Sequence, residues 1–281
     1  MNFGPYRDLQ KLGEGASGAA YKAQDSRDGR IVAIKTISGF EPDGFLTARS
    51  VLLRGAEQLA LLHHRCIPAV YEVIHQDSSL YIVTEFVVGE SLDRLTKAGQ
   101  KLRLSRRLEI IKNACAVMHD VHEHGIVHRA MKPSKILVLQ DNSVKILGFG
   151  ISTIWLFLSA ELPHLPYDVH YHHQGTFRGD AIFGPGPDIW SIGVILFELL
   201  QGRLPFVGTN LEDLYGQILK AEIPATPIEL PLAGEFDKIL ARALAKQAEY
   251  QYRSIGELAA DLGTLIPEVR QCEEDNDPTS S

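Results

Sequence analysis

Short apolar runs that alternate with polar positions dominate the first part of the chain, and longer segments with helical spacing dominate the rest. Gly, Asp and Asn separate the short runs, and the pair Asp28-Gly29 is typical of a hairpin turn. Strands are expected at residues 6–12, 19–23, 31–37, 79–85, 136–139 and 143–147. The first part of the chain is therefore expected to form a sheet.

The longer segments carry apolar residues at the spacing of a helix. Between residues 105 and 124 these residues fall on one face, and Gly125 ends the segment. Residues 188–200 are apolar nearly all round, as expected of a helix at the centre of a domain. Further helices are expected at residues 211–220, 235–244 and 255–266.

Composition and charge narrow the class of protein. The chain has 281 residues, 45% hydrophobic and 22% charged, enough for one two-lobed domain or two small ones. Its net charge of −7, without a basic cluster, argues against nucleic acid or an anionic membrane as the main partner. The longest apolar stretch, residues 192–200, is too short to span a bilayer, and no apolar run follows Met1. We therefore expect a cytoplasmic protein.

The cysteines and the last residues add little chemistry. Cys66, Cys115 and Cys272 show neither metal-site spacing nor a disulfide pattern, and we interpret Cys66 and Cys115 as small core residues. Residues 267–281 are acidic and polar, and we expect them to form a disordered tail.

Three glycines, Gly13, Gly15 and Gly18, occupy the turn between the first two expected strands. A G-x-G-x-x-G motif alone is weak evidence, because a dinucleotide site would need a helix after it, whereas a strand is expected here. Between two strands the same motif lets backbone N–H groups cover phosphates. Lys35 ends the sequence Val-Ala-Ile-Lys in the third strand, and the alternative for it is a solvent-facing strand lysine.

Residues 126–138 carry the most specific pattern, reading Ile-Val-His-Arg-Ala-Met-Lys-Pro-Ser-Lys-Ile-Leu-Val, with Gly148-Phe149-Gly150 downstream. They resemble the catalytic loop and magnesium-binding segment of protein kinases. His128, Arg129 and Lys132 match that pattern. The other motifs follow in the family's order, and the end of the chain is similar to that of bacterial eukaryotic-like Ser/Thr kinases.

The resemblance spans residues 6–266 and implies a bilobal α+β protein kinase-like fold. A small lobe of antiparallel strands with one helix, at residues 47–63, would occupy residues 1–88. A larger, mainly helical lobe would occupy residues 89–266, after a hinge near residues 86–89. No second domain is visible.

The resemblance also implies a nucleotide site. Lys35 stands where the family keeps its phosphate-binding lysine, Thr84 stands at the gatekeeper position, and Ala20 replaces a valine usual above the adenine, which should weaken adenine binding. The residues expected to contact nucleotide are Gly13, Gly15, Gly18, Ala33, Lys35, Glu85, Val87 and Leu137, with Glu85 and Val87 acting through their backbone.

Four positions depart from the family's chemistry. Ala130 replaces the aspartate that accepts the substrate's proton, a role worth about 10²- to 10⁴-fold in rate. Lys135 and Gly148 replace the asparagine and aspartate that hold magnesium. Gly55 replaces the helix glutamate that pairs with the lysine, and Glu57 would face elsewhere. Neither an intact catalytic set nor a metal site is therefore expected.

One hypothesis is that Lys35, Lys132 and Lys135 bind the phosphates of ATP without magnesium, and the alternative is that Lys135 turns to solvent. Asp188 would hold the backbone of the catalytic loop, as in the family. Otherwise no cofactor is expected.

The segment between residues 151 and 187 departs most from the family. Its apolar run at residues 154–158 must be buried against its own domain or a partner. The family's Ala-Pro-Glu motif is not recognisable at residues 182–187. In the family, the glutamate of that motif pairs with the arginine that corresponds to Arg253. A histidine cluster suggests a metal site, with a solvated loop as the alternative. Its members are His164, His170, His172 and His173.

We therefore expect a pseudokinase, a kinase-like domain without phosphotransfer activity that acts as a binding or regulatory module for a protein partner. The alternative is a weak or unorthodox ATP-dependent Ser/Thr protein kinase, which Lys35 and the complete glycine motif favour. A third interpretation is a decaying copy with no selected function.

Overall fold

The structure, a computed structural model, describes residues 3–15, 18–37, 64–76, 79–97, 102–149, 167–175, 184–227 and 231–276. The chain divides into two compact units, residues 1–89 with 147–162 and residues 90–146 with 163–281. The division after Gly89 lies close to the expected lobe boundary at residues 88 and 89. Leu147, Gly148 and Phe149, expected in the second lobe, group with the first unit.

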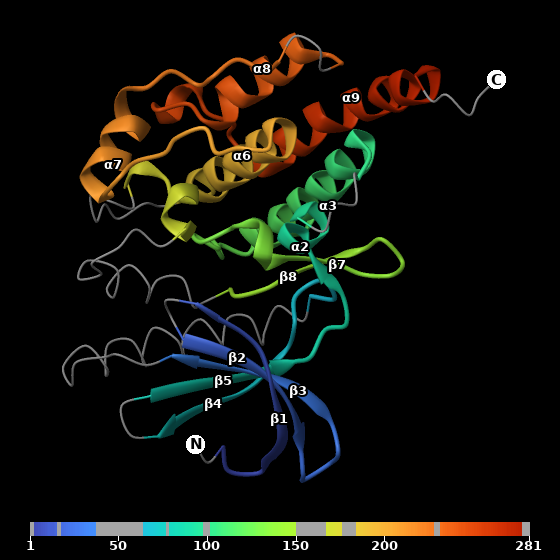
Figure 1. The fold of residues 1–281 in the computed structure, drawn as a ribbon, viewed down its shortest axis with the longest axis vertical. Coiled ribbons are helices and arrows are strands. Elements are labelled where there is room, and N and C mark those ends of the chain that lie inside the picture. The colour runs from blue at the N-terminus through green and yellow to red at the C-terminus, as the bar shows by residue number, and fades with distance from the viewer. Residues whose placement is uncertain are drawn as a thin grey trace. The chain divides into compact units, whose positions relative to one another are not determined.

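The first unit is built on a five-stranded antiparallel sheet in the order β1-β2-β3-β5-β4 (Figure 1). Its strands are β1 (Tyr6–Gly15), β2 (Gly18–Asp25), β3 (Ile31–Ile37), β4 (Val70–Gln76) and β5 (Ser79–Glu85). The strands expected from the sequence in this part are confirmed, although β1 continues to Gly15. The expected helix at residues 47–63, with Gly55 and Glu57, lies outside the described residues.

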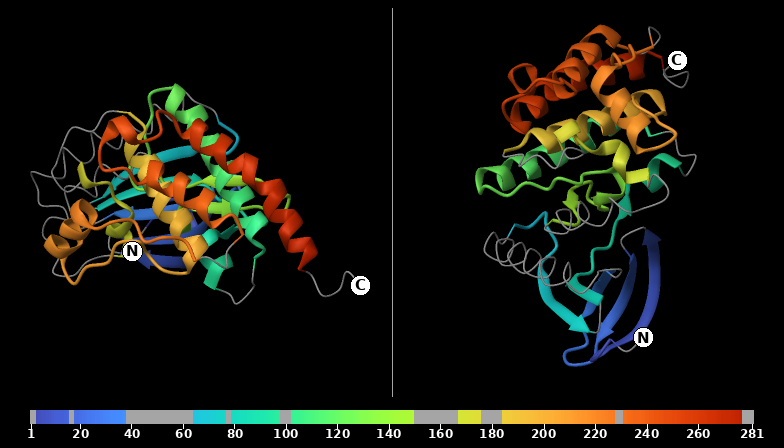
Figure 2. Two further views of the ribbon diagram at one scale, coloured as in Figure 1. Left: turned by 90° about the horizontal axis from the view of Figure 1, so that it is seen from above. Right: turned by 90° about the vertical axis from the view of Figure 1, so that its left-hand side faces the viewer.

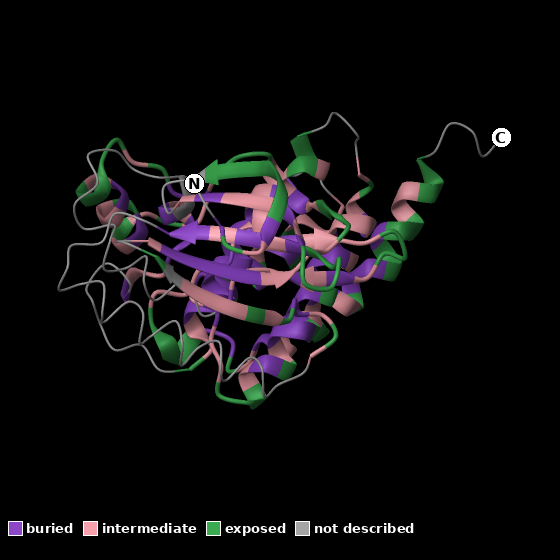
Figure 3. Cartoon of the chain, turned by 90° about the horizontal axis from the view of Figure 1, so that it is seen from below, coloured by how far each residue is buried: buried purple, intermediate pink, exposed green. Residues whose placement is uncertain are grey.

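One face of this sheet carries the core of the first unit. Alternate residues of β2, β3 and β5 are buried there, because successive side chains of a strand point to opposite faces. Phe3 covers the cluster and meets the Tyr81 ring edge-on at 5.1 Å between centroids. The buried members are Phe3, Tyr6, Ala23, Val32, Ile34, Tyr81 and Val83. Figure 3 shows that the strands of the sheet consist largely of buried and half-buried residues, and in β3 the two classes alternate from Val32 to Lys35.

The second unit combines a small sheet, β6-β7-β8, with helices (Figures 1 and 2). The strands are β6 (Glu90–Ser91), β7 (Ile136–Val138) and β8 (Val144–Ile146), and the short 3-10 helices are η1 (Pro133–Lys135), η3 (Tyr167–Tyr171) and η4 (Ala248–Tyr250). The α-helices are α2 (Leu92–Lys97), α3 (Leu104–Glu123), α6 (Gly186–Gln201), α7 (Leu211–Lys220), α8 (Ala233–Ala243) and α9 (Ile255–Asp275). The helices expected after residue 104 are thereby confirmed in number and order for the described part.

Helix α6 lies at the centre of the second unit, packed against α3, α8 and α9. It is buried nearly all round, as its composition predicted. Gly193 makes the close approach of α8 possible, because a Cβ there would lie 2.9 Å from both the Ala243 Cβ and a Leu244 methyl group. No helix in the described part of the chain combines the length and the apolar composition that a membrane span requires.

Helix α9 packs along α3 and corrects the prediction of a disordered tail from Pro267. The helix continues through Pro267 to Asp275, because Val269 extends its buried face beyond Ile266. Arg270 forms an ion pair with Glu109 of α3. The tail prediction is therefore wrong for its described part, while residues 277–281 lie outside the description.

The interpretation of the cysteines as core residues holds in part. Cys115 is fully buried in α3, and its burial raises the pKa of its thiol. Cys66 is only half-buried, because it lies in the turn before β4, where its N–H donates to His64 Nδ1 at 3.2 Å.

Candidate functional site

The first unit gathers four of the side chains implied in nucleotide binding on the face of its sheet opposite the core. Ala20 on β2 stands opposite Lys35 on β3, and Ala33 on β3 stands opposite Thr84 on β5. Each of the four is half-buried, whereas Val32, Ile34 and Val83, neighbours on β3 and β5 that point to the other face, are buried in the core. The strand register alone therefore assembles a lysine and two small residues on one surface.

The glycine-rich turn has two different requirements for glycine. Gly18 has φ = 121°, and a Cβ there would lie 2.1 Å from the Thr36 carbonyl oxygen, so β2 could not approach β3 with any other residue. Thr36 adds a second link, since its hydroxyl accepts from the Ala19 N–H at 3.0 Å and donates to the Ala19 carbonyl at 3.1 Å. Gly18 is thus explained by sheet packing.

Gly13, by contrast, has no packing reason to be glycine. It stands opposite Ala20, and a Cβ added to it would meet no atom within 4 Å. The open space beside Gly13 is what close approach of a ligand phosphate to the backbone requires. Gly15 pairs with Gly18 at the end of the hairpin.

Glu85 and Val87, expected to meet an adenine ring, lie at the end of β5 and in the segment that follows. The Glu85 N–H donates to the Ala69 carbonyl at 2.9 Å, so a ligand contact at Glu85 would have to use its carbonyl oxygen. Next to it, the Lys22 ammonium lies 5.0 Å from the centre of the Phe86 ring. Val87 is half-buried.

Asp188 organises the candidate catalytic loop of the second unit from the first turn of α6. Its carboxylate is fully buried and accepts from the backbone N–H of His128 at 2.7 Å and of Arg129 at 2.6 Å. The prediction that Asp188 holds the loop backbone is confirmed. His122 of α3 lies 2.8 Å from the same carboxylate through Nε2.

His122 was missed in the sequence, because it follows Val121 at the edge of the buried stripe of α3, where the pattern distinguishes no polar partner. Its side chain is only 7% exposed, and Nδ1 has no hydrogen-bond partner among the described residues. Because an ionised carboxylate can only accept, Nε2 is the ring nitrogen that donates to Asp188.

The loop keeps a constrained backbone around Ala130. Arg129 has φ = 65°, a left-handed conformation that costs a non-glycine residue about 1–3 kcal/mol. The bond from its N–H to Asp188 compensates for this strain, and the Ala130 N–H donates to His128 Nδ1 at 3.2 Å. The methyl group of Ala130 has no atom that can accept a proton.

Lys132 precedes the single turn η1 and Lys135 ends it, and the Lys135 N–H donates to the Lys132 carbonyl at 2.9 Å. Both side chains are half-buried, and Leu137 follows in β7 opposite Ser91 and Lys145. Lys35, the third lysine of the phosphate hypothesis, belongs to the first unit. Gly148, also in the first unit, has φ = 91°, a conformation that glycine adopts readily.

Two members of the histidine cluster, His172 and His173, contribute to packing. His172 is 7% exposed, and the His173 ring meets the Trp190 ring edge-on at 5.5 Å. Among the described residues, no group of three or more His, Cys, Asp or Glu side chains is suited to hold a metal ion. His164 and the apolar run at residues 154–158 lie outside the described residues.

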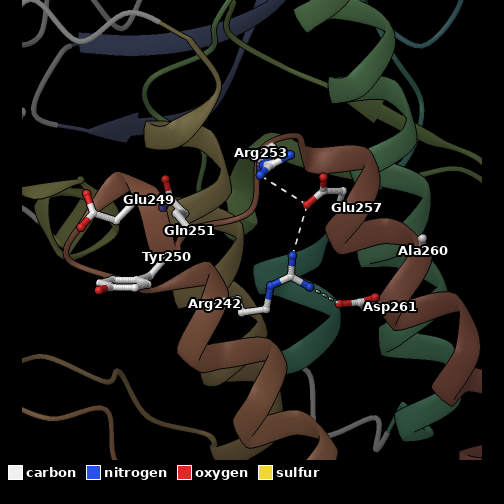
Figure 4. A pocket seen from close by; sticks show the side chains of 8 residues that line it. All are labelled: Arg242, Glu249, Tyr250, Gln251, Arg253, Glu257, Ala260 and Asp261. Carbon is white, nitrogen blue, oxygen red and sulfur yellow. Dashed lines mark hydrogen bonds and ion pairs between the residues drawn. The ribbon is translucent and has the colours of Figure 1, made fainter.

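Arg253 lies at a polar cavity of about 580 Å³ formed by η4, α8 and α9 (Figure 4). The floor is a network in which the Arg242 guanidinium donates to Asp261 at 3.0 Å and to Glu257 at 3.2 Å, while lying 3.9 Å above the Tyr252 ring. The Arg253 N–H also donates to Glu257. The cavity is lined by Arg242, Glu249, Tyr250, Gln251, Arg253, Glu257, Ala260 and Asp261.

A family model described as the protein kinase domain matches residues 6–250 of the chain. The chain belongs to the protein kinase family. The predicted bilobal α+β fold class is confirmed by this match together with the antiparallel sheet and the helical second unit.

This kinase domain is similar to bacterial Ser/Thr kinases. It is 33% identical over 276 residues to a probable serine/threonine-protein kinase PknB of Lactococcus lactis, covering 96% of this chain and 43% of the relative. It is 32% identical over 264 residues to a probable serine/threonine-protein kinase of Streptomyces coelicolor, covering 91% of this chain and 39% of the relative. It is 29% identical over 262 residues to the serine/threonine-protein kinase PknB of Mycolicibacterium smegmatis, covering 89% of this chain and 41% of the relative. The chain thus spans about two fifths of the length of these relatives.

Proposed function

We propose that this kinase domain is a pseudokinase that binds and regulates a protein partner without transferring phosphate. One observation carries the proposal: Asp188 holds the backbone at His128 and Arg129, yet the next residue, Ala130, stands where the reacting hydroxyl would need a proton acceptor. Lys135 and Gly148 stand where two magnesium ligands are needed, and neither side chain can hold the cation.

A phosphotransfer assay tests this proposal. The protein is incubated with γ-labelled ATP and a generic substrate protein, in magnesium and in manganese, beside the variants Lys35→Met and Lys22→Met. Lys22 is the matched control because it lies on the same face of the sheet, on the neighbouring strand. We expect no incorporation above the Lys35→Met background, and incorporation that Lys35→Met abolishes and Lys22→Met retains would overturn the proposal.

A second candidate is a weak or unorthodox ATP-dependent Ser/Thr kinase. The open space at Gly13, beside the face that carries Ala20, Ala33 and Lys35, supports nucleotide binding to the first unit. The similar proteins are named as serine/threonine-protein kinases, which favours the same activity. The assay above discriminates the two candidates.

We further propose that ATP binds without magnesium, with lysine side chains in place of the metal balancing its phosphate charge. Thermal unfolding with ATP is measured in EDTA and in magnesium, for the protein and for Lys135→Asn and Lys145→Asn. We expect ATP to raise the unfolding temperature in EDTA, and Lys135→Asn to abolish that rise while Lys145→Asn preserves it. A rise that needs magnesium, or no rise in either condition, would refute this mode of binding.

The partner is proposed to be a protein, and a cytoplasmic location stays a prediction. The net charge of −7 gives no electrostatic basis for binding nucleic acid or an anionic membrane.

A further inference from the structure

The polar cavity at η4, α8 and α9 (Figure 4) has room for a small molecule, since its volume of about 580 Å³ lies within the range of about 300–1,000 Å³ usual for ligand sites. The charged groups of its floor already bind one another. The Arg242 guanidinium donates to Glu257 and Asp261, and the Tyr252 hydroxyl donates to Asp261 at 2.7 Å. A ligand must therefore be held by the other side chains of the lining.

Three of these other side chains are exposed and lie close together in the sequence. Among the described residues, neither the Glu249 carboxylate nor the Arg253 guanidinium has a hydrogen-bond or ion-pair partner. The Tyr250 ring between them is 66% exposed, which is unusual for a side chain of its size. An anion, a cation and an open aromatic face are thus gathered at one cavity.

Gln251 is the buried member of the lining, with only 8% of its surface exposed. Its Nε2 donates to the Ala243 carbonyl at 3.0 Å and to the Gly186 carbonyl at 3.4 Å. These two acceptors fix which end of the amide is nitrogen, so the other end is Oε1. No donor in the described part of the chain bonds to Oε1, and Gln251 therefore offers the cavity an acceptor that a ligand N–H can satisfy.

We propose that this cavity binds a small zwitterion with a guanidinium group at one end and a carboxylate at the other, of which free arginine is the simplest. The guanidinium stacks on the Tyr250 ring and donates to Glu249 and to Gln251 Oε1. Arg253 takes the carboxylate as a charge-assisted pair. This inference does not depend on whether the domain transfers phosphate.

The charge of the lining fits such a ligand. Three acidic residues face two arginines across the cavity, and free arginine carries a net positive charge at neutral pH. An arginine within a partner protein would match Tyr250 and Glu249 equally well, but it has no carboxylate and would leave Arg253 without an anion. The free amino acid therefore satisfies more of the lining than a partner's side chain does.

A titration of the whole, ¹⁵N-labelled protein with L-arginine at physiological salt tests the proposal, with the amide signals of residues 249–253 as the readout. We expect these signals to shift with a dissociation constant of about 2 mM or lower, from the usual ligand efficiency of a molecule of this size. Agmatine lacks the carboxylate, and L-citrulline has a neutral urea in place of the guanidinium. We expect each to bind about threefold to fivefold more weakly, as for the loss of one exposed ion pair.

Variants then assign each end of the ligand to its partner. Arg253→Gln should remove the preference for L-arginine over agmatine, and Glu249→Gln should remove the preference over L-citrulline, because each variant deletes the group that reads that end. The matched controls are Arg65→Gln and Glu268→Gln, since both side chains are exposed and without a partner among the described residues. Both controls should keep both preferences.

Two results would overturn the proposal. One is the absence of shifts at residues 249–253 when L-arginine is added. The other is agmatine binding to the unaltered protein as tightly as L-arginine does, because the site would then recognise the cation alone, as a site for the arginine side chain of a partner protein would.

Discussion

Replacing Asp188 with asparagine removes the carboxylate that joins α6 to the candidate catalytic loop. Three hydrogen bonds of 2.7, 2.6 and 2.8 Å reach this carboxylate, from the His128 and Arg129 backbones and from the His122 ring. Bonds to a charged group contribute about 1.5–3 kcal/mol each, and asparagine keeps one acceptor oxygen but turns an NH2 group toward a donor. We expect the free energy of unfolding to fall by about 3–5 kcal/mol, as for other broken buried pairs.

Urea unfolding followed by far-UV circular dichroism measures this loss. Asp141→Asn is the control, because its carboxylate also accepts hydrogen bonds, two from Ser143, but lies on an exposed turn. We expect no resolvable change for the control. The reasoning is refuted if Asp188→Asn shifts the unfolding midpoint no further than Asp141→Asn does, because the loop would then be held by other contacts.

Three other changes test separate parts of the structure. Gly18→Ala should lower the free energy of unfolding by at least about 3 kcal/mol, because its Cβ would overlap the Thr36 carbonyl, whereas Gly13→Ala should change it by less than about 1 kcal/mol in the same urea titration. Glu273→Gln should cost about 1 kcal/mol and speed amide exchange in the last turns of α9, since Glu273 accepts from the Ser105 N–H and hydroxyl. The stability of the protein relative to Lys246→Met should rise between about pH 8 and pH 10.4, because burial lowers the pKa of Lys246 to about 8, and in that window the unfolded chain binds the proton and the folded one does not. For a fully buried amine this rise in stability would be about 3 kcal/mol, and for the half-exposed Lys246 we expect about 1 kcal/mol. Urea titrations across this pH range measure it, and a fall in stability would contradict the prediction.

Most strands and helices could be predicted because turn-forming residues interrupt the pattern at their ends. Strand β5 and helix α7 have the bounds that the sequence predicted, since glycine, proline or an N-capping residue lies close by. Asn210, for example, caps α7 by accepting from the Asp213 N–H at 2.9 Å. The kinase resemblance then supplied the role of Asp188, which spacing alone would not.

The features that the sequence did not predict, at the end of α9 and at His122 and Thr36, have one physical cause, which is pairing between residues far apart in the chain. The end of α9 looked like a tail because its carboxylates were counted as solvent-exposed charge, whereas Glu273 binds the first turn of α3. His122 and Thr36 were overlooked for the same reason, since each makes its hydrogen bonds to another element of the fold. A local pattern contains no record of such partners.

The way the loop is held has a consequence for how this domain can change over generations. The three contacts of Asp188 involve neither the Ala130 nor the Lys135 side chain, so the loop backbone can stay anchored when these two side chains change. Gly148 is different, because its φ of 91° penalises any side chain by about 1 kcal/mol or more. Loss of the chemistry at these positions would therefore be easy, and its restoration would meet its main obstacle at residue 148.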